Sequence, residues 1–108
     1  MNDIKSLQGR IKELVDKINS KHKHSCPDLI SFMKVVEELG EITEILLRTH
    51  IKSRKHDKLS KEKVKEEMGS EIADCIIAVL SLANDFDVDI SEFLEKKLKK
   101  HEERCTQY

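Results

Sequence analysis

Apolar side chains recur every three or four residues along most of the chain, and this spacing is typical of amphipathic helices. The first apolar stripe extends from Ile4 to Ile18, and a second helix is predicted from about Asp28 to about Ile51. Pro27 suits the first turn of the second helix, because an N–H at that position has no partner inside the helix. The first half of the chain is therefore predicted to form two helices.

A third helix is predicted to begin after Ser60, a suitable N-cap, and to end at about Asp85. Its second half is unusual, because from Cys75 to Ala83 only Ser81 is polar. A helix that is apolar on all sides is normally buried. We therefore expect other helices to surround this segment.

The fourth predicted helix follows a short turn. Asp89 and Glu92 have the spacing of a capping box, with aspartate in place of the usual serine or threonine. The inward stripe of this helix is expected to contain Leu94, Leu98, His101 and Cys105.

The length and the scarcity of turn residues restrict the fold further. A chain of 108 residues is one domain, residues 1–108, and a partner subunit would add core to so small a protein. With 3 glycines and 1 proline, the chain has too few turn residues for a β-sandwich or β-barrel and no glycine-rich phosphate loop. The predicted fold class is all-α, a four-helix bundle completed by oligomerisation.

Charge gives no reason to expect nucleic acid as a partner. The 20 basic residues nearly cancel the 21 acidic ones, leaving a net charge of −1. The basic connector from Arg48 to Lys65 lacks the interleaved aromatic side chains that stack on bases, so we interpret it as a solvated loop. Arg54 or Lys55 in this connector could reach a bound triphosphate.

The cysteines and the hydropathy of the chain indicate where in the cell the protein is expected. The three cysteines, Cys26, Cys75 and Cys105, are far apart and form no CxxC, which indicates reduced thiols and a cytoplasmic protein. The longest apolar run, Cys75 to Leu80, is much too short to cross a bilayer. No membrane partner is expected.

Two acidic pairs stand out among many charged residues. Glu38 and Glu41 are three residues apart on the second predicted helix, and Glu71 and Asp74 are three apart on the third, so each pair shares one helix face. Other acidic residues are interpreted as solvated surface, namely Glu66, Glu67, Glu102 and Glu103.

Asp74 does not fit a solvated surface, because its neighbours Ile77 and Ala78 belong to the fully apolar segment and no lysine lies within a turn. A buried carboxylate is costly unless it is neutralised or paired. Two helices that each present two carboxylates near a buried seam would form an oxygen-rich cage, which suits Mg²⁺ or Mn²⁺. Bound Mg²⁺ can screen phosphate charge and activate water, which points to phosphoanhydride hydrolysis.

These residues resemble a known family. Glu37-Glu38-Leu39-Gly40-Glu41, followed after the connector by Glu71-Ile72-Ala73-Asp74, is similar to the EExxE…ExxD pattern of MazG-like nucleotide pyrophosphohydrolases, the all-α NTP pyrophosphatases. The resemblance extends from about Pro27 to Arg104. It implies Mg²⁺-dependent cleavage of a nucleoside triphosphate between its α- and β-phosphates, releasing the monophosphate and pyrophosphate, with Mn²⁺ as a substitute metal. Clearance of surplus or non-standard nucleotides would be one role.

The resemblance also implies roles for individual residues. The metal ligands would be Glu38, Glu41, Glu71 and Asp74, and one of these or Glu37 would orient the attacking water.

The end of the fourth helix resembles the KxxxNxxR ending of the family. Lys97, His101 and Arg104 would face the substrate, with histidine standing where the family often has asparagine. Members of the family are usually dimers or tetramers, which implies a homodimer or homotetramer here.

Two other functions remain open. Phosphoribosyl-ATP pyrophosphohydrolase is similar in its helices and acidic motif, although no equivalent of its N-terminal substrate region is found. The chain could instead be a non-catalytic helical interaction module whose acidic pairs form salt bridges across the bundle. The base preference is not indicated, because the chain has no tryptophan.

Overall fold

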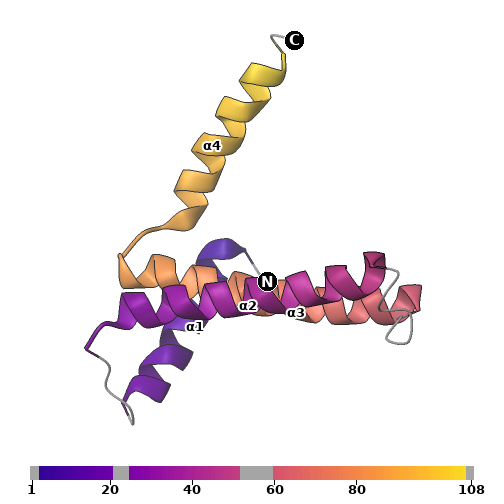
Figure 1. Cartoon of the computed structure of the whole chain (residues 1–108). Coiled ribbons are helices and arrows are strands. Elements are labelled where there is room, and N and C mark those ends of the chain that lie inside the picture. Colours follow the sequence, from indigo (N-terminus) through magenta and orange to yellow (C-terminus); the bar gives the residue numbers. More distant parts are fainter. Residues whose placement is uncertain (1–2, 21–24, 52–59, 107–108) are drawn as a thin grey trace. The chain divides into compact units, whose positions relative to one another are not determined.

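A computed structural model describes residues 3–20, 25–51 and 60–106 of the chain. Within these ranges all regular structure is helical: α1 spans Ile4–Asn19, α2 Pro27–His50, α3 Lys61–Asp85 and α4 Ile90–Cys105 (Figure 1). The all-α prediction is confirmed, and the four helices begin and end close to their predicted positions. No helix in these ranges combines the length and the apolar composition needed to span a bilayer.

Side-chain caps explain where three of the helices begin. The Asp3 carboxylate accepts a hydrogen bond from the Ser6 N–H at 2.7 Å, at the start of α1. Ser60 Oγ accepts from the Lys63 N–H at 3.2 Å before α3, as its sequence position predicted. Each cap satisfies a backbone donor that has no partner inside the helix.

The predicted cap of α4 is also present. The Asp89 carboxylate accepts a hydrogen bond from the Ser91 N–H at 3.1 Å. Just before it, α3 ends in a Schellman motif: the Val88 N–H donates to the Ala83 carbonyl at 3.0 Å and the Asp87 N–H donates to the Asn84 carbonyl at 3.0 Å. Asp87 has a φ of 53°, the left-handed conformation that this motif requires and that aspartate tolerates better than most residues.

The helices belong to two compact units, each described here by itself. The terminal unit combines Met1–Ser25 with Leu80–Tyr108, and the α2–α3 unit covers Cys26–Val79. Residues of α3 contribute to both units.

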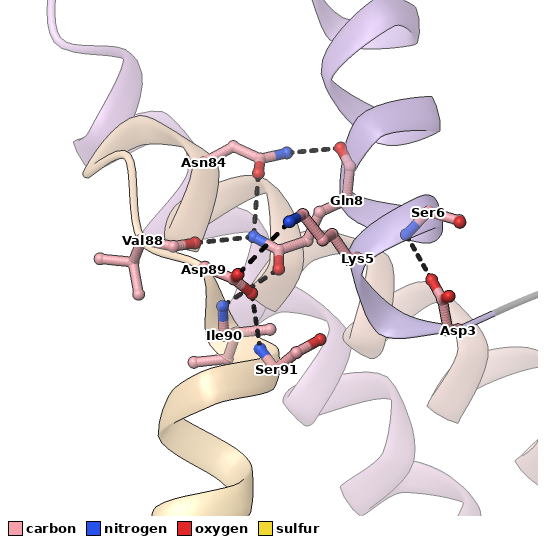
Figure 2. A network of polar contacts seen from close by, with 9 residues as sticks. All are labelled: Asp3, Lys5, Ser6, Gln8, Asn84, Val88, Asp89, Ile90 and Ser91. Carbon is pink, nitrogen blue, oxygen red and sulfur yellow. Dashed lines mark hydrogen bonds and ion pairs between the residues drawn. The ribbon is translucent and has the colours of Figure 1, made fainter.

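The terminal unit is organised around the buried side chain of Gln8 on α1, which is 7% exposed (Figure 2). Its Nε2 donates to Asn84 Oδ1 at 3.1 Å and to the Val88 carbonyl at 2.8 Å, while its Oε1 accepts from the Ile90 N–H at 3.1 Å. Asn84 Nδ2 donates in return to the Gln8 carbonyl at 2.9 Å. One amide therefore connects α1 to the end of α3 and the start of α4.

The α2–α3 unit is an antiparallel helical hairpin (Figure 1). Arg48 near the end of α2 pairs with Glu67 near the start of α3 at 3.1 Å, while Glu38 lies against residues further along α3. Ile45 and Ala78 are the buried apolar residues described in this unit, 3% and 5% exposed. A hairpin of two helices buries only the side of each helix that faces the other.

Two expectations about burial are therefore wrong for the single chain. In the apolar segment of α3, Ile76 and Ile77 are 47% and 46% exposed, and only Ala78 and Leu80 are buried. The expected inward stripe of α4 is also exposed along its length, at Leu94, Leu98, His101 and Cys105.

Replacing Gln8 by leucine should lower the free energy of unfolding by about 1–3 kcal/mol, because it leaves the Ile90 N–H and the Val88 carbonyl without this buried partner. Arg10→Leu, an exposed change two residues along the same helix, should shift it by no more than about 0.5 kcal/mol. Urea denaturation followed by circular dichroism measures both. Equal effects of the two substitutions would show that the Gln8 hydrogen bonds contribute nothing specific.

Candidate metal centre

Three carboxylates converge on the facing sides of α2 and α3. Glu38 of α2 and Glu71 and Asp74 of α3 each offer an oxygen, and these oxygens all lie within 4.8 Å of one another. The three-residue spacing on α3 places Glu71 and Asp74 on one face. The antiparallel register then brings Glu38 opposite that face, so the cluster follows from the two sequence motifs together with the hairpin.

Glu38 is the most buried acidic group of the cluster. Its side chain is only 5% exposed, and one oxygen, Oε2, is buried without a hydrogen-bond partner among the described residues. The other oxygen, Oε1, lies 3.2 Å from the ammonium of Lys34, which also contacts Glu37 at 3.3 Å. A buried, unpartnered carboxylate oxygen is costly, because nothing replaces the water it has lost.

Glu71 faces two other carboxylates. A hydrogen bond shared with Glu41, the loss of water around the group and the proximity of Glu38 together raise the pKa of Glu71 to about 7. Its Oε2 is also buried without a partner in the described structure. Like charges at this separation cannot all ionise without cost, so either a proton or a cation is needed among them.

Lys34 provides part of that compensation from the α2 side. Hydrogen bonds to Glu38 and Glu37 raise the pKa of Lys34, so its ammonium stays charged. The side chain is 55% exposed, and its contact accounts for one oxygen of Glu38 only. The i, i+4 spacing of Lys34 and Glu38 is a local signal in the sequence for this contact.

A pocket of about 380 Å³ continues from the cluster along the hairpin. Glu41 and Glu71 line the end next to the cluster, and Arg48 and Glu67 line the rest with Ser70. The complete lining also includes Glu44 and Ile45. Because this pocket borders the carboxylates, a ligand bound to a cation there could extend into it.

The predicted site residues differ in where they lie. Glu38, Glu71 and Asp74 come together, and Glu41 contacts Glu71, although Glu41 is outside the set of three oxygens within 4.8 Å. Glu37 is exposed and contacts Lys34.

The residues predicted to bind substrate are not part of this cluster. Lys97, His101 and Arg104 lie in α4 of the terminal unit, and all three are exposed. Arg54 and Lys55 lie outside the described residues.

Three interpretations of individual residues need correction. Asp74 is exposed, and Glu38 is instead the carboxylate at the buried position, because the hairpin covers the face of α2 that carries it. Arg48 belongs to the last turn of α2 rather than to the connector. Glu67 is not solvated surface, because its partly buried carboxylate is paired with Arg48.

The donor set fits a hard divalent cation. It consists of carboxylate oxygens from two helices, and at Glu38 and Glu71 one oxygen each is buried without a partner in the described ranges. Oxygen ligands of this kind suit Mg²⁺ or Mn²⁺ better than softer metals, which prefer histidine and cysteine.

Comparison of the chain with protein-family models, curated proteins and solved structures found no match. The functional interpretation therefore depends on the residues and geometry of the chain itself.

Without metal, the raised pKa of Glu71 should make the protein less stable as the pH rises from about 5 to about 7, because the folded state holds a proton there that the unfolded chain releases at lower pH. Below the unfolded-state pKa of the carboxyl the effect vanishes. Glu71→Gln should flatten this part of the profile. Thermal unfolding in chelator at a series of pH values tests this, and identical profiles for both proteins would contradict the carboxylate coupling.

Proposed function

We propose that this protein is a Mg²⁺-dependent nucleotide pyrophosphohydrolase of the MazG-like type. The observation that carries the proposal is the burial of the Glu38 carboxylate, whose side chain is only 5% exposed. One of its oxygens has no partner among the described residues, and two further carboxylates from α3 lie close to it. A bound divalent cation would satisfy that oxygen and relieve the repulsion in the cluster. The acidic motifs that resemble the family supply these same residues.

The reaction proposed is the hydrolysis of a nucleoside triphosphate to the monophosphate and pyrophosphate. Water adds to phosphorus, the bond between the α- and β-phosphates breaks, and the proton from water passes to a carboxylate. Glu38, Glu71 and Asp74 would hold the metal with Glu41, and Glu37 or Glu41 would orient the water. Bound Mg²⁺ supplies charge neutralisation at the phosphates and lowers the pKa of water.

The remaining substrate contacts are proposed from the sequence. Lys97, His101 and Arg104 share one stripe of α4 and are exposed, so they are available to phosphates or sugar. Arg54 and Lys55 would add positive charge from the connector. The cytoplasm, where nucleoside triphosphates and reduced thiols occur together, would be the location.

The protein is proposed to act as a homodimer or homotetramer. Within the described residues the buried apolar side chains are few, namely Ile11, Ile45, Ala78 and Leu80, whereas much of α2 and α3 presents exposed apolar groups such as Phe32 and Ile76. Large exposed apolar surfaces mark interaction sites. A second copy offers the same apolar faces, so a symmetric contact would cover both at once.

Analytical ultracentrifugation should therefore give a mass of two or four chains, and Ile76→Lys should shift the protein toward the monomer by placing a charge in the contact. The exposed Leu14→Lys on α1 is the matched control. A monomer mass of 12.5 kDa for the unmodified protein would contradict the oligomer.

A non-catalytic helical module is the second candidate, because the structure does contain ion pairs that could be purely structural. Arg48 pairs with Glu67 across the hairpin and Lys34 pairs with Glu38. Such a module needs no metal, whereas a metal site stabilises the folded state by RT ln(1 + [L]/Kd), about 2.7 kcal/mol at a hundredfold excess over Kd.

The deciding experiment combines Mg²⁺ binding with product identification. Mg²⁺ alone should raise the melting temperature, and a panel of nucleoside triphosphates and phosphoribosyl-ATP should yield pyrophosphate with the monophosphate. Asp74→Asn and Glu41→Gln should lower turnover at least about 100-fold, because each removes ligand charge but keeps the side-chain shape. Asp16→Asn on α1 is the matched control.

The outcomes separate the candidates. Stabilisation by Mg²⁺ and pyrophosphate release that both depend on Asp74 support the proposal. Absence of any Mg²⁺ effect favours the helical module. Cleavage restricted to phosphoribosyl-ATP favours a phosphoribosyl-ATP pyrophosphohydrolase, and release of orthophosphate alone rejects pyrophosphohydrolysis.

A further inference from the structure

The pocket beside the carboxylate cluster contains a feature that the metal does not explain. At the end of the pocket away from the cluster, the Arg48 guanidinium of α2 reaches α3. One of its amino nitrogens lies 3.1 Å from a carboxylate oxygen of Glu67. Both side chains are partly buried, 26% and 31% exposed. A partly buried arginine fixed by a carboxylate presents a rigid planar group to the pocket.

Arg48 also has unused hydrogen-bonding capacity. Its Nε is buried and has no acceptor among the described residues. Arginine carries five N–H donors in a fixed plane, and the contact with Glu67 uses only part of them. Because Arg48 lines the pocket, the N–H groups that Glu67 leaves unused are the ones that a ligand there could bind.

The charges around Arg48 indicate which part of a nucleotide belongs there. Glu67, which lines the pocket beside Arg48, already neutralises the guanidinium. Phosphate groups would therefore gain little here and would be attracted to the metal at the other end. The apolar floor formed by Ile45 and the guanidinium plane instead suit a flat, uncharged heterocycle, since bases stack on arginine planes and bond to polar edges.

The size of the pocket agrees with this assignment. Its volume of about 380 Å³ falls within the range of small-molecule sites. Glu41 and Glu71 line both the pocket and the metal end, so one ligand could place its phosphates at the cluster and its base beside Arg48.

We propose that Arg48, held in place by Glu67, contacts the nucleobase of the substrate and makes the site selective for nucleotides over inorganic polyphosphates. The assignment rests on the proposed pyrophosphohydrolase function and adds to it a base-binding residue that is not aromatic. Ser70 on the opposite helix also lines the pocket and offers a further hydroxyl.

Kinetics with and without a base test this role. Arg48→Met should lower kcat/KM for nucleoside triphosphates about 10-fold or more, mainly through KM, because a hydrogen bond to the guanidinium and a stacking surface are lost. The inhibition constant of inorganic tripolyphosphate, which has no base, should change less than about twofold, because its contacts lie at the metal. Glu67→Gln, which keeps a side chain of the same shape beside Arg48, should give a smaller loss in the same direction.

Controls exclude a general effect on folding. Arg10→Met, an exposed arginine of α1, should leave both measurements unchanged, and circular dichroism should show that Arg48→Met and Glu67→Gln retain their helices. If Arg48→Met does not fold, the comparison rests on Glu67→Gln. An equal loss for nucleotides and tripolyphosphate would overturn base binding in favour of phosphate binding, and no loss for either would overturn it outright.

A binding measurement separates this proposal from the proposed function. If the unmodified protein hydrolyses no nucleotide, the pyrophosphohydrolase function fails. Calorimetric titration with a nucleoside monophosphate and with orthophosphate, both in Mg²⁺, then tests whether Arg48 contacts a base in the pocket. Weaker binding of the monophosphate alone in Arg48→Met supports base contact, and unchanged binding of both rejects it.

Discussion

A carboxylate that has lost its water is the constraint on which the rest of the α2–α3 unit depends. Glu38 is buried where two helices meet, and the groups opposite it, Glu71 and Asp74, carry the same charge when they are ionised. Lys34 balances one oxygen from the solvent side. The remaining charge needs a proton or a cation, and the proton that Glu71 retains near neutral pH is the response of the protein alone.

This constraint explains why the hairpin needs contacts elsewhere. Repulsion in the cluster pushes α2 and α3 apart, and the buried Ile45 and the pairing of Arg48 with Glu67 act at positions further along the same seam. An ion pair that is a quarter to a third exposed contributes little by itself, so apolar burial must supply most of the cohesion. Few apolar residues are buried in the described part of this unit, so the proposed cation and the proposed second subunit would each add stability.

The helices could be predicted from the sequence because the information is local. Apolar spacing located each helix, and the caps at Ser60 and Asp89 are formed by side chains within a few residues of the backbone groups they bind. The acidic motifs also pointed to Glu38, Glu71 and Asp74, which lie together, whereas Glu41 lies outside that set of three.

What the sequence did not predict depends on how helices meet. Glu38 and Asp74 were both expected near a buried seam, and the hairpin register buries Glu38 but leaves Asp74 exposed. The pairing of Arg48 with Glu67 joins residues far apart in the chain, and the hydrogen bonds of Gln8 reach across most of its length. No periodicity in a single helix encodes such contacts. The apolar side chains of α3 show the same limit, because their pattern predicted burial whereas Ile76 and Ile77 are exposed in the single chain.

Under the proposed function, the two ends of the pocket would divide the recognition of one molecule by charge. At the cluster, carboxylates can hold a cation, which then attracts phosphate; at Arg48, the guanidinium is already neutralised by Glu67 and has little attraction left for phosphate. The same ion pair that weakens phosphate binding also fixes the plane of the guanidinium, and a fixed plane is what stacking on a base requires. A lone arginine at this position would compete with the metal for the triphosphate. In the proposed site, pairing it with Glu67 would remove that competition and leave a surface for the uncharged end of a nucleotide.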